Sequence, residues 1–513
     1  MKSKFLTPIL TFFAAGILLL SSCEKNDDAV AIITPPPPPP PPSPVVKPNL
    51  VFFGISASNV LVKYNANASQ TVLAQFPVTG LQAGENLLGI DFRPATGELY
   101  GLGNNNRLYV INTETGVARA VGAAPFTPVI LGPIAGFDFN PTVDRIRVVT
   151  NVGQNFRLNP ENGTVAATDG NINNAEKITG VAYTNSFAGA ATTTLYDIDN
   201  YKLFKQEPPN NGTITAIGSL GLVSTGAGDF DISPDNSVTL VPATVGAVNS
   251  LYQLDTLNGK LLNLGTLSVP LIGLAIPTDP VAYSTDAANN LLIFNLTAPN
   301  TPVSKPIPGL QGGENILGID MRPATGQLYA LGSTSRIYTI NMSSGVATVV
   351  GAGPFVPALS GTSFGFDFNP TVDRIRVVSN TGQNLRLDPN TGMVAAVDLP
   401  LNPGTPAVSA AAYTNNFAGA TTTTLYVMDV LKNKLYIQNP PNNGTLVEVG
   451  NISGTFVEAN GFDIGGTSGK AFALLNDEGL VKLFQVNLQN AQLNAGTRVS
   501  ISGIRGFTLG LGF

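Results

Sequence analysis

The stretch Gly80–Tyr100, GLQAGENLLGIDFRPATGELY, returns almost unchanged at Gly309–Tyr329 as GLQGGENILGIDMRPATGQLY, with 17 of 21 positions identical. The same offset of 229 residues joins Gly136–Val149 to Gly365–Val378, where both copies read GFDFNPTVDRIRVV. Self-similarity at a fixed period is the signature of a repeat architecture. The sequence therefore predicts a tandem duplication.

A shorter period runs inside each half, and we place the two halves at residues 49–280 and 281–513. Similar four-residue signatures, such as GIDF and GFDF, recur every 44 to 51 residues, a spacing typical of a propeller blade. Their first residues are Gly89, Gly136, Gly180, Asp229 and Gly273 in the first half and Gly318, Gly365, Ala410, Gly461 and Gly506 in the second.

One period contains four short strand patterns separated by turns. Gly89–Phe92 is mostly apolar, Glu98–Leu102 and Arg107–Asn112 alternate, and Val117–Gly122 ends the unit. A lone four-stranded sheet does not cover both of its faces, so ten such sheets are expected to stack radially. The sequence predicts an all-β protein, a β-propeller of about ten four-stranded blades.

The chain ends leave two arrangements open. Val51–Ser56 lacks a preceding first strand, and Gly506–Phe513 is a first strand with no followers, so the two ends could pair and close one ten-bladed ring. If Gly273–Ile276 pairs with Val51–Ser56 instead, two five-bladed rings result. We favour two rings because each half contains a complete set of signatures.

The composition excludes several function classes. The chain has no His, no Trp and a single Cys, so Ser-His-Asp and Cys-His catalysis and His or Cys zinc sites are not available. Its net charge is −6 and no Lys/Arg cluster matches a row of phosphates, so we expect no nucleic-acid partner. No cofactor is expected from the composition.

The N-terminus is typical of an exported lipoprotein. Residues 1–22 combine Lys2 and Lys4 with an apolar stretch and small residues, and Cys23 follows at the position where such proteins receive a lipid. Residues 23–48 contain an acidic cluster and the eight prolines of Pro35–Pro42, which favour an extended polyproline spacer. We expect an outer membrane lipoprotein, tethered through the lipid and exposed at the cell surface.

Four blocks carry a family resemblance: GIDFRPATGELY at Gly89–Tyr100, GFDFNPTVDRIRVV in both halves, LRLDPNTGMVAAVD at Leu385–Asp398 and AYTNNFAGATTTTLY at Ala412–Tyr426. They resemble the bacterial family catalogued as domain of unknown function 4394, twice over, across nearly all of residues 49–513. The resemblance implies a secreted or surface repeat domain and brings no catalytic residues with it.

Six aspartates occupy the same place in the first strand of their units, and first strands line the channel of a propeller. A ring of carboxylates would bind a hard cation such as Ca²⁺, or serve as acid and base in glycoside cleavage. The alternative is structural, with each carboxylate bound by its own turn or by a nearby arginine such as Arg93 or Arg145. The six are Asp91, Asp138, Asp231, Asp320, Asp367 and Asp463.

Arg145 and Arg147, with Arg374 and Arg376 in the second copy, lie two apart and so share one face of a strand. They form a candidate anion-binding pair, although the same pattern is typical of a solvated strand face.

The interpretation that fits these features is a non-catalytic surface propeller that binds a carbohydrate or a protein, or acts as a scaffold. The alternative is an enzyme, either a carboxylate-based glycoside hydrolase or a metal-assisted lactonase, since neither strictly requires His.

Overall fold

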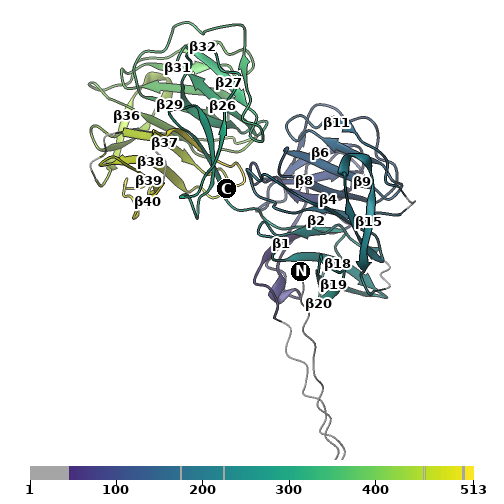
Figure 1. The fold of residues 1–513 in the computed structure, drawn as a ribbon. Helices are drawn as coiled ribbons and strands as arrows, with labels where there is room; N and C mark the ends of the chain where they lie inside the picture. The colour runs from purple at the N-terminus through teal and green to yellow at the C-terminus, as the bar shows by residue number, and fades with distance from the viewer. Residues whose placement is uncertain (1–45, 174–175, 223–225, 455, 457, 500–502) are drawn as a thin grey trace, which may run out of the picture. The chain divides into compact units, whose positions relative to one another are not determined.

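The computed structural model describes residues 46–173, 176–222, 226–454, 456, 458–499 and 503–513, shown as a ribbon in Figure 1. Residues Lys47–Phe513 form one compact unit. The described residues contain ten antiparallel sheets and no α-helix, with three 3₁₀ turns: η1 (Ala66–Ala68), η2 (Pro209–Asn211) and η3 (Pro441–Asn443). The all-β prediction is confirmed, while the predicted signal peptide and Cys23 lie outside the described residues.

Five of the sheets belong to the first half, and the strands of each lie side by side in the following order. They are β21 (Gly273–Ala275), β1 (Val51–Ile55), β2 (Val60–Asn65) and β3 (Ala74–Pro77); β4 (Leu87–Phe92), β5 (Leu99–Gly103), β6 (Arg107–Ile111) and β7 (Ala118–Val121); β8 (Ala135–Asn140), β9 (Arg145–Thr150), β10 (Asn155–Leu158) and β11 (Val165–Thr168); β12 (Gly180–Tyr183), β13 (Leu195–Ile198), β14 (Lys202–Gln206) and β15 (Ile214–Ser219); and β16 (Gly226–Ala227), β18 (Thr239–Val245), β19 (Val248–Leu254) and β20 (Leu261–Thr266), with β17 (Asp231–Ile232) also paired to β18.

The other five sheets belong to the second half and have four strands each. They are β41 (Arg505–Leu509), β22 (Val281–Thr285), β23 (Asn290–Asn295) and β24 (Val303–Pro306); β25 (Ile316–Arg322), β26 (Gln327–Gly332), β27 (Arg336–Ile340) and β28 (Ala347–Val350); β29 (Phe364–Asn369), β30 (Arg374–Ser379), β31 (Asn384–Leu387) and β32 (Val394–Val397); β33 (Ala410–Tyr413), β34 (Leu425–Asp429), β35 (Lys434–Gln438) and β36 (Leu446–Asn451); and β37 (Glu458–Ile464), β38 (Ala471–Asp477), β39 (Leu480–Val486) and β40 (Thr497–Arg498).

The terminal strand of each half completes a sheet within that half. β21 pairs antiparallel with β1, with Phe53 opposite Ala275, and β41 pairs antiparallel with β22, with Tyr283 opposite Thr508. The two chain ends, β1 and β41, are therefore not partners, as a single ring of ten would require.

The strands that carry the repeated signatures, here called the first strands, pack against one another. In the second half β25 packs against β29, β29 against β33 and β33 against β37, and both β37 and β25 pack against β41. The leading glycine of the signature permits this approach, because a Cβ built on Gly136 of β8 would lie 2.7 Å from the backbone nitrogen of Val181 in β12.

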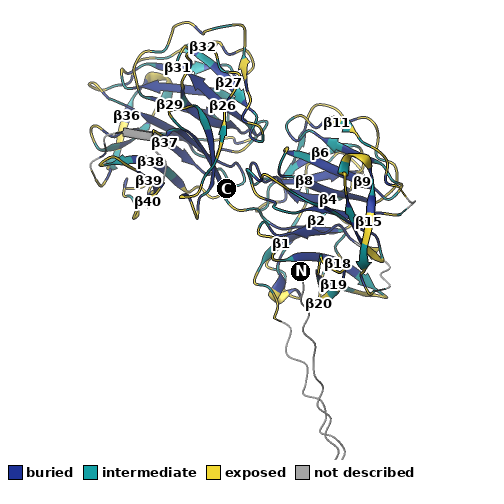
Figure 2. Ribbon diagram, in the orientation of Figure 1, coloured by how far each residue is buried: buried dark blue, intermediate teal, exposed yellow. Residues whose placement is uncertain are grey.

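The hydrophobic core lies between neighbouring sheets. Figure 2 shows the buried residues in dark blue, and most of them lie on the strands. One cluster joins Tyr100 and Leu108 of the second sheet to Phe139 and Val148 of the third. Without tryptophan, phenylalanine and tyrosine fill these spaces: the rings of Tyr100 and Phe139 lie 5.2 Å apart, and those of Tyr329 and Phe368, in the other half, 5.1 Å apart.

Candidate functional site

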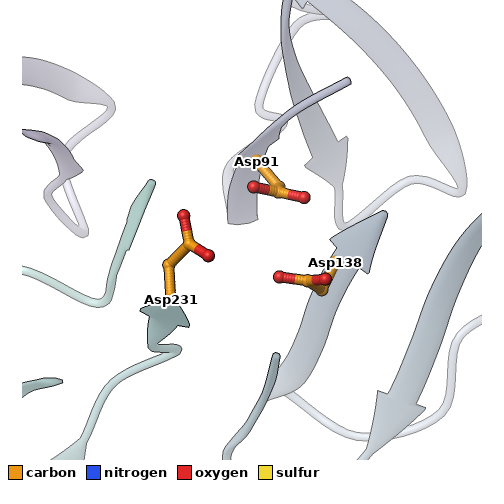
Figure 3. A group of neighbouring side chains, drawn as sticks. All are labelled: Asp91, Asp138 and Asp231. Atoms are coloured by element: carbon orange, nitrogen blue, oxygen red, sulfur yellow. The ribbon is translucent and has the colours of Figure 1, made fainter. Parts of the chain in front are cut away.

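The six predicted aspartates gather into two groups of three. In the first triad, Asp91 of β4, Asp138 of β8 and Asp231 of β17 each place one carboxylate oxygen within 4.8 Å of the others. Figure 3 shows the three side chains pointing toward one another. The second triad is formed in the same way by Asp320 of β25, Asp367 of β29 and Asp463 of β37. All six residues are buried.

Each carboxylate of the first triad accepts a hydrogen bond from a backbone amide that belongs to another sheet. Asp91 accepts from the amide of Phe139 at 2.8 Å, and Asp138 from that of Tyr183 at 3.0 Å. Asp231 accepts from the amide of Ile276, directly after β21, at 2.6 Å. The triad thus links first strands across sheet boundaries.

The second triad repeats these links, so they belong to the shared scaffold. Asp320, Asp367 and Asp463 accept from the amides of Phe368, Tyr413 and Leu509 at 2.7, 2.8 and 2.7 Å.

The structural alternative predicted from the sequence is wrong about the arginines, although Asp91, Asp231 and Asp463 also accept the amide of the residue that follows each of them. Neither Arg93 nor Arg145 binds a triad carboxylate in the described residues. Arg93 is fully buried and forms an ion pair with Asp144, 51 residues away, while Arg145 donates to the backbone oxygen of Asp144. Each carboxylate also accepts an amide of a neighbouring sheet, 45 or 48 residues further along the chain for Asp138 and Asp91, because packed first strands bring those amides close.

Burial and mutual repulsion raise the pKa values of the triad carboxyls. Burial raises the pKa of Asp91 well above its usual value, and the charge of Asp231 adds to the increase. Burial, followed by repulsion from Asp91 and Asp231, does the same to Asp138. Burial raises the pKa values of Asp231 and Asp463 to about 7. Each triad therefore retains protons at neutral pH.

Three clustered carboxylates are oxygen donors of the kind that Ca²⁺ prefers, but Ca²⁺ takes about six to eight oxygens. In the triads some of those oxygens already accept backbone amides. Among the described residues, the cavities of about 10, 440, 270 and 20 Å³ have no triad residue in their linings. The triads therefore resemble a buried structural hydrogen-bond network rather than an open ligand site.

A fourth buried aspartate, Asp229, stands beside the first triad and was missed from the sequence. Its carboxylate accepts from the amide of Phe137 at 2.8 Å and from that of Val181 at 2.9 Å. Its only sequence signal was that it opens the DFDI signature where the other units carry Gly or Ala, as Gly461 does in the second half.

The candidate arginine pairs divide by burial. Arg147 is 1% exposed and donates to Asp169 at 2.6 Å and to Asn155 at 2.7 Å; Arg376 makes the equivalent bonds to Asp398 and Asn384. The solvated-face interpretation is therefore wrong for Arg147 and Arg376. Arg145 and Arg374 are partly exposed and donate to the backbone oxygens of Asp144 and Asp373.

The family model described as Domain of unknown function (DUF4394) matches residues 60–275 and 290–508, so the chain belongs to this family and contains its domain twice. Among curated proteins, no sequence matches the chain. A solved structure with some similarity is the extracellular domain of a protein assigned as the one component system BT4673 of B. thetaiotaomicron. The TM-score is 0.24 at 13% sequence identity, and the match covers 88% of this chain and 59% of that one.

In the part of the chain that the structure describes, no helix has the length and apolarity needed to span a membrane.

Proposed function

We propose that the chain is a membrane-tethered surface lipoprotein in which two five-bladed β-propellers act as a non-catalytic binding module. The observation that carries the non-catalytic role is the state of the triads, the most obvious acid–base groups in the chain. They are buried, hydrogen-bonded to backbone amides, and outside the cavities described above.

The strand pairing supports two rings of five. Each half contains five sheets, and each half supplies its own completing strand, β21 for β1 and β41 for β22. In the second half the contacts among first strands run from β25 through β29, β33, β37 and β41 back to β25. A closed propeller has no exposed inner edge, which is the usual solution for such sheets.

The tether rests on the sequence alone. Cys23 follows an export signal, and the eight prolines of Pro35–Pro42 place the folded part away from the lipid at a rise of about 3.1 Å per residue. A spacer of this kind serves a domain that has to reach something outside the membrane.

Fractionation of cells tests the tether and the surface location. Wild-type protein and the control Ser22→Ala, which keeps the thiol, are expected in the membrane fraction and to be degraded when intact cells meet proteinase K. Cys23→Ala is expected in the soluble fraction, because the lipid would be the anchor. A Cys23→Ala protein that still sediments with membranes and resists carbonate extraction contradicts the proposal.

The enzymatic alternative has one feature in its favour, the clustering of carboxylates. Glycosidases, however, separate their two carboxyl groups by about 5 to 9.5 Å with the substrate between them. Here all six carboxyl groups are buried, and no triad residue lines any of the cavities given above for the described residues, so a substrate has no place between them.

Calcium binding is tested by thermal melts of wild type and Asp138→Asn in excess chelator and in about 1 mM Ca²⁺. No calcium effect is expected. A rise in the wild-type Tm that Asp138→Asn abolishes would contradict the structural role of the triad and identify it as a metal site.

A further inference from the structure

Outside the triads, the largest of the described cavities has a volume of about 440 Å³ and is lined by both halves of the compact unit 47–513. The first half contributes the face of β4 to β6 and the residues up to Arg119, and the second contributes Phe417, Thr467 and Leu511. Pockets for small ligands measure about 300–1,000 Å³, so a ligand of one or two sugar rings fits this size.

Two residues of opposite charge, Glu98 and Arg119, line this cavity without forming an ion pair with each other. Among the described residues no ion pair joins Glu98 to Arg119, and the Arg119 guanidinium donates to the backbone oxygen of Ala324 at 3.2 Å. One carboxylate oxygen of Glu98 is buried and has no hydrogen-bond partner. Burial raises the pKa of Glu98, although Arg119 and Arg93 oppose the shift. The wall therefore retains unused hydrogen-bonding capacity.

The fold itself does not require these charges. At the offset of 229 residues, Gln327 at the start of β26 stands in place of Glu98, which directly precedes β5. Thr348 of β28 stands in place of Arg119 of β7. If the two charged residues were needed to hold the fold together, both halves would contain them. The charged pair occurs in the first half alone.

The remaining walls are apolar and partly open. Val117 is 53% exposed and Phe417 is 39% exposed, and Leu99, Val110 and Leu511 also line the cavity. An aromatic ring, a carboxylate and a guanidinium in the walls of one cavity match the two kinds of surface of a sugar, an apolar C–H face and a rim of hydroxyls.

We propose that this cavity binds the end of a neutral glycan, one or two hexose residues in length. Sugar hydroxyls donate to Glu98 and accept from Arg119, and the C–H face of a ring packs on Phe417. This inference rests on the proposed binding function and supplies its ligand class.

The chain offers a matched control in Phe187, which occupies the same position in the equivalent loop and is 37% exposed. Phe187 lines a second cavity of about 270 Å³ together with Asp279, and no Lys or Arg lines that cavity. Glycan binding through the charged pair therefore predicts different effects for the two phenylalanines.

The test is isothermal titration of the detergent-solubilised full chain with lactose, maltose, cellobiose and N,N′-diacetylchitobiose. At least one disaccharide is expected to bind saturably with a Kd between about 10 μM and 1 mM. Phe417→Ala and the isosteric Glu98→Gln should each raise that Kd about tenfold with an unchanged Tm, while Phe187→Ala changes it less than about twofold.

No saturable binding of any of the four sugars at about 20 mM overturns the inference, since even a weak site would then be filled. An equal loss in Phe187→Ala and Phe417→Ala also overturns it. These outcomes do not depend on where Cys23→Ala is found in the cell. Wild-type protein in the soluble fraction would contradict the proposed function while leaving sugar binding intact.

Discussion

The two halves hold the same carboxylate triad with different neighbours. Beside the second triad, the Thr508 hydroxyl lies 2.9 Å from Asp320 and 3.0 Å from Asp463. At the equivalent place in the first half stands Ala275, which has no hydroxyl, while Asp229 replaces Gly461 and binds two further amides. Both halves therefore keep the hydrogen bonds that link neighbouring sheets, but different side chains surround the triad carboxylates in each half.

The largest expected effect comes from removing the terminal strand of the second half. Deletion of residues 505–513 takes away β41, which pairs with β22 and buries Phe507 and Leu509. Two such side chains are worth about 3–6 kcal/mol, and an open sheet edge adds to the loss. We expect the second half to unfold at a much lower temperature in differential scanning calorimetry. An unchanged Tm would show that β41 does not complete that half.

Stability is expected to fall as pH rises from about 5 to 9, because the triad pKa values are raised in the folded state. A carboxyl with a raised folded pKa contributes stability below its unfolded pKa, and this contribution is lost as pH passes the folded pKa, about 7 for Asp231 and Asp463. Each proton contributes a slope of about 1.4 kcal/mol per pH unit.

Urea unfolding at several pH values measures this slope. Asp231→Asn should flatten the loss in the first half and leave that of the second half unchanged. A stability that increases from pH 5 to 9 contradicts the raised pKa values.

A smaller effect, of opposite sign, is expected at Asp197. This residue is fully buried, and neither of its carboxylate oxygens has a hydrogen-bond partner; Val427 occupies its place in the second half. Asp197→Val should stabilise the first half by about 1–3 kcal/mol, the cost of burying an unpaired polar group. The reciprocal Val427→Asp should destabilise the second half. The urea midpoints of the two variants measure both changes in stability. A lower midpoint for Asp197→Val than for wild type would mean that the Asp197 carboxyl makes a stabilising interaction.

The smallest effect is expected for Thr508→Ala, which gives the second triad the neighbour that the first triad has. Loss of the hydroxyl should cost about 0.5–1.5 kcal/mol, the net value of an ordinary hydrogen bond. Thermal melts at pH 6 measure the loss, with Thr467→Ala at an exposed position as the control. No change in Tm would mean that the hydroxyl does not stabilise the carboxyls.

The architecture could be predicted because its signals are local. Each unit has its own strand alternation and turn residues, as in Asn112–Gly116, where Asn112 accepts the amide of Glu114 and Gly116 has a φ of 73°. The pairing of Gly273–Ala275 with β1 is the favoured one of two arrangements, because each half contains a complete set of signatures.

The partners of the candidate site residues could not be predicted, because they lie about one blade away. Nothing near Asp138 in the sequence indicates the amide of Tyr183, 45 residues further on. Strand alternation placed Arg145 and Arg147 on one face of a strand. It did not show that the next sheet covers Arg147, which donates a hydrogen bond to Asn210 in the turn η2 between β14 and β15. Burial between sheets depends on how the sheets pack, which the period alone does not specify.

The identical blocks Gly136–Val149 and Gly365–Val378 occupy equivalent strands, β8–β9 and β29–β30. Unequal crossing-over between them would remove 229 residues in frame and join the start of one half to the end of the other. Such a product would still have five sheets, with β41 in the place of β21 beside β1. The same event in the other direction would add a complete half. The number of halves can therefore change during inheritance without leaving a strand unpaired.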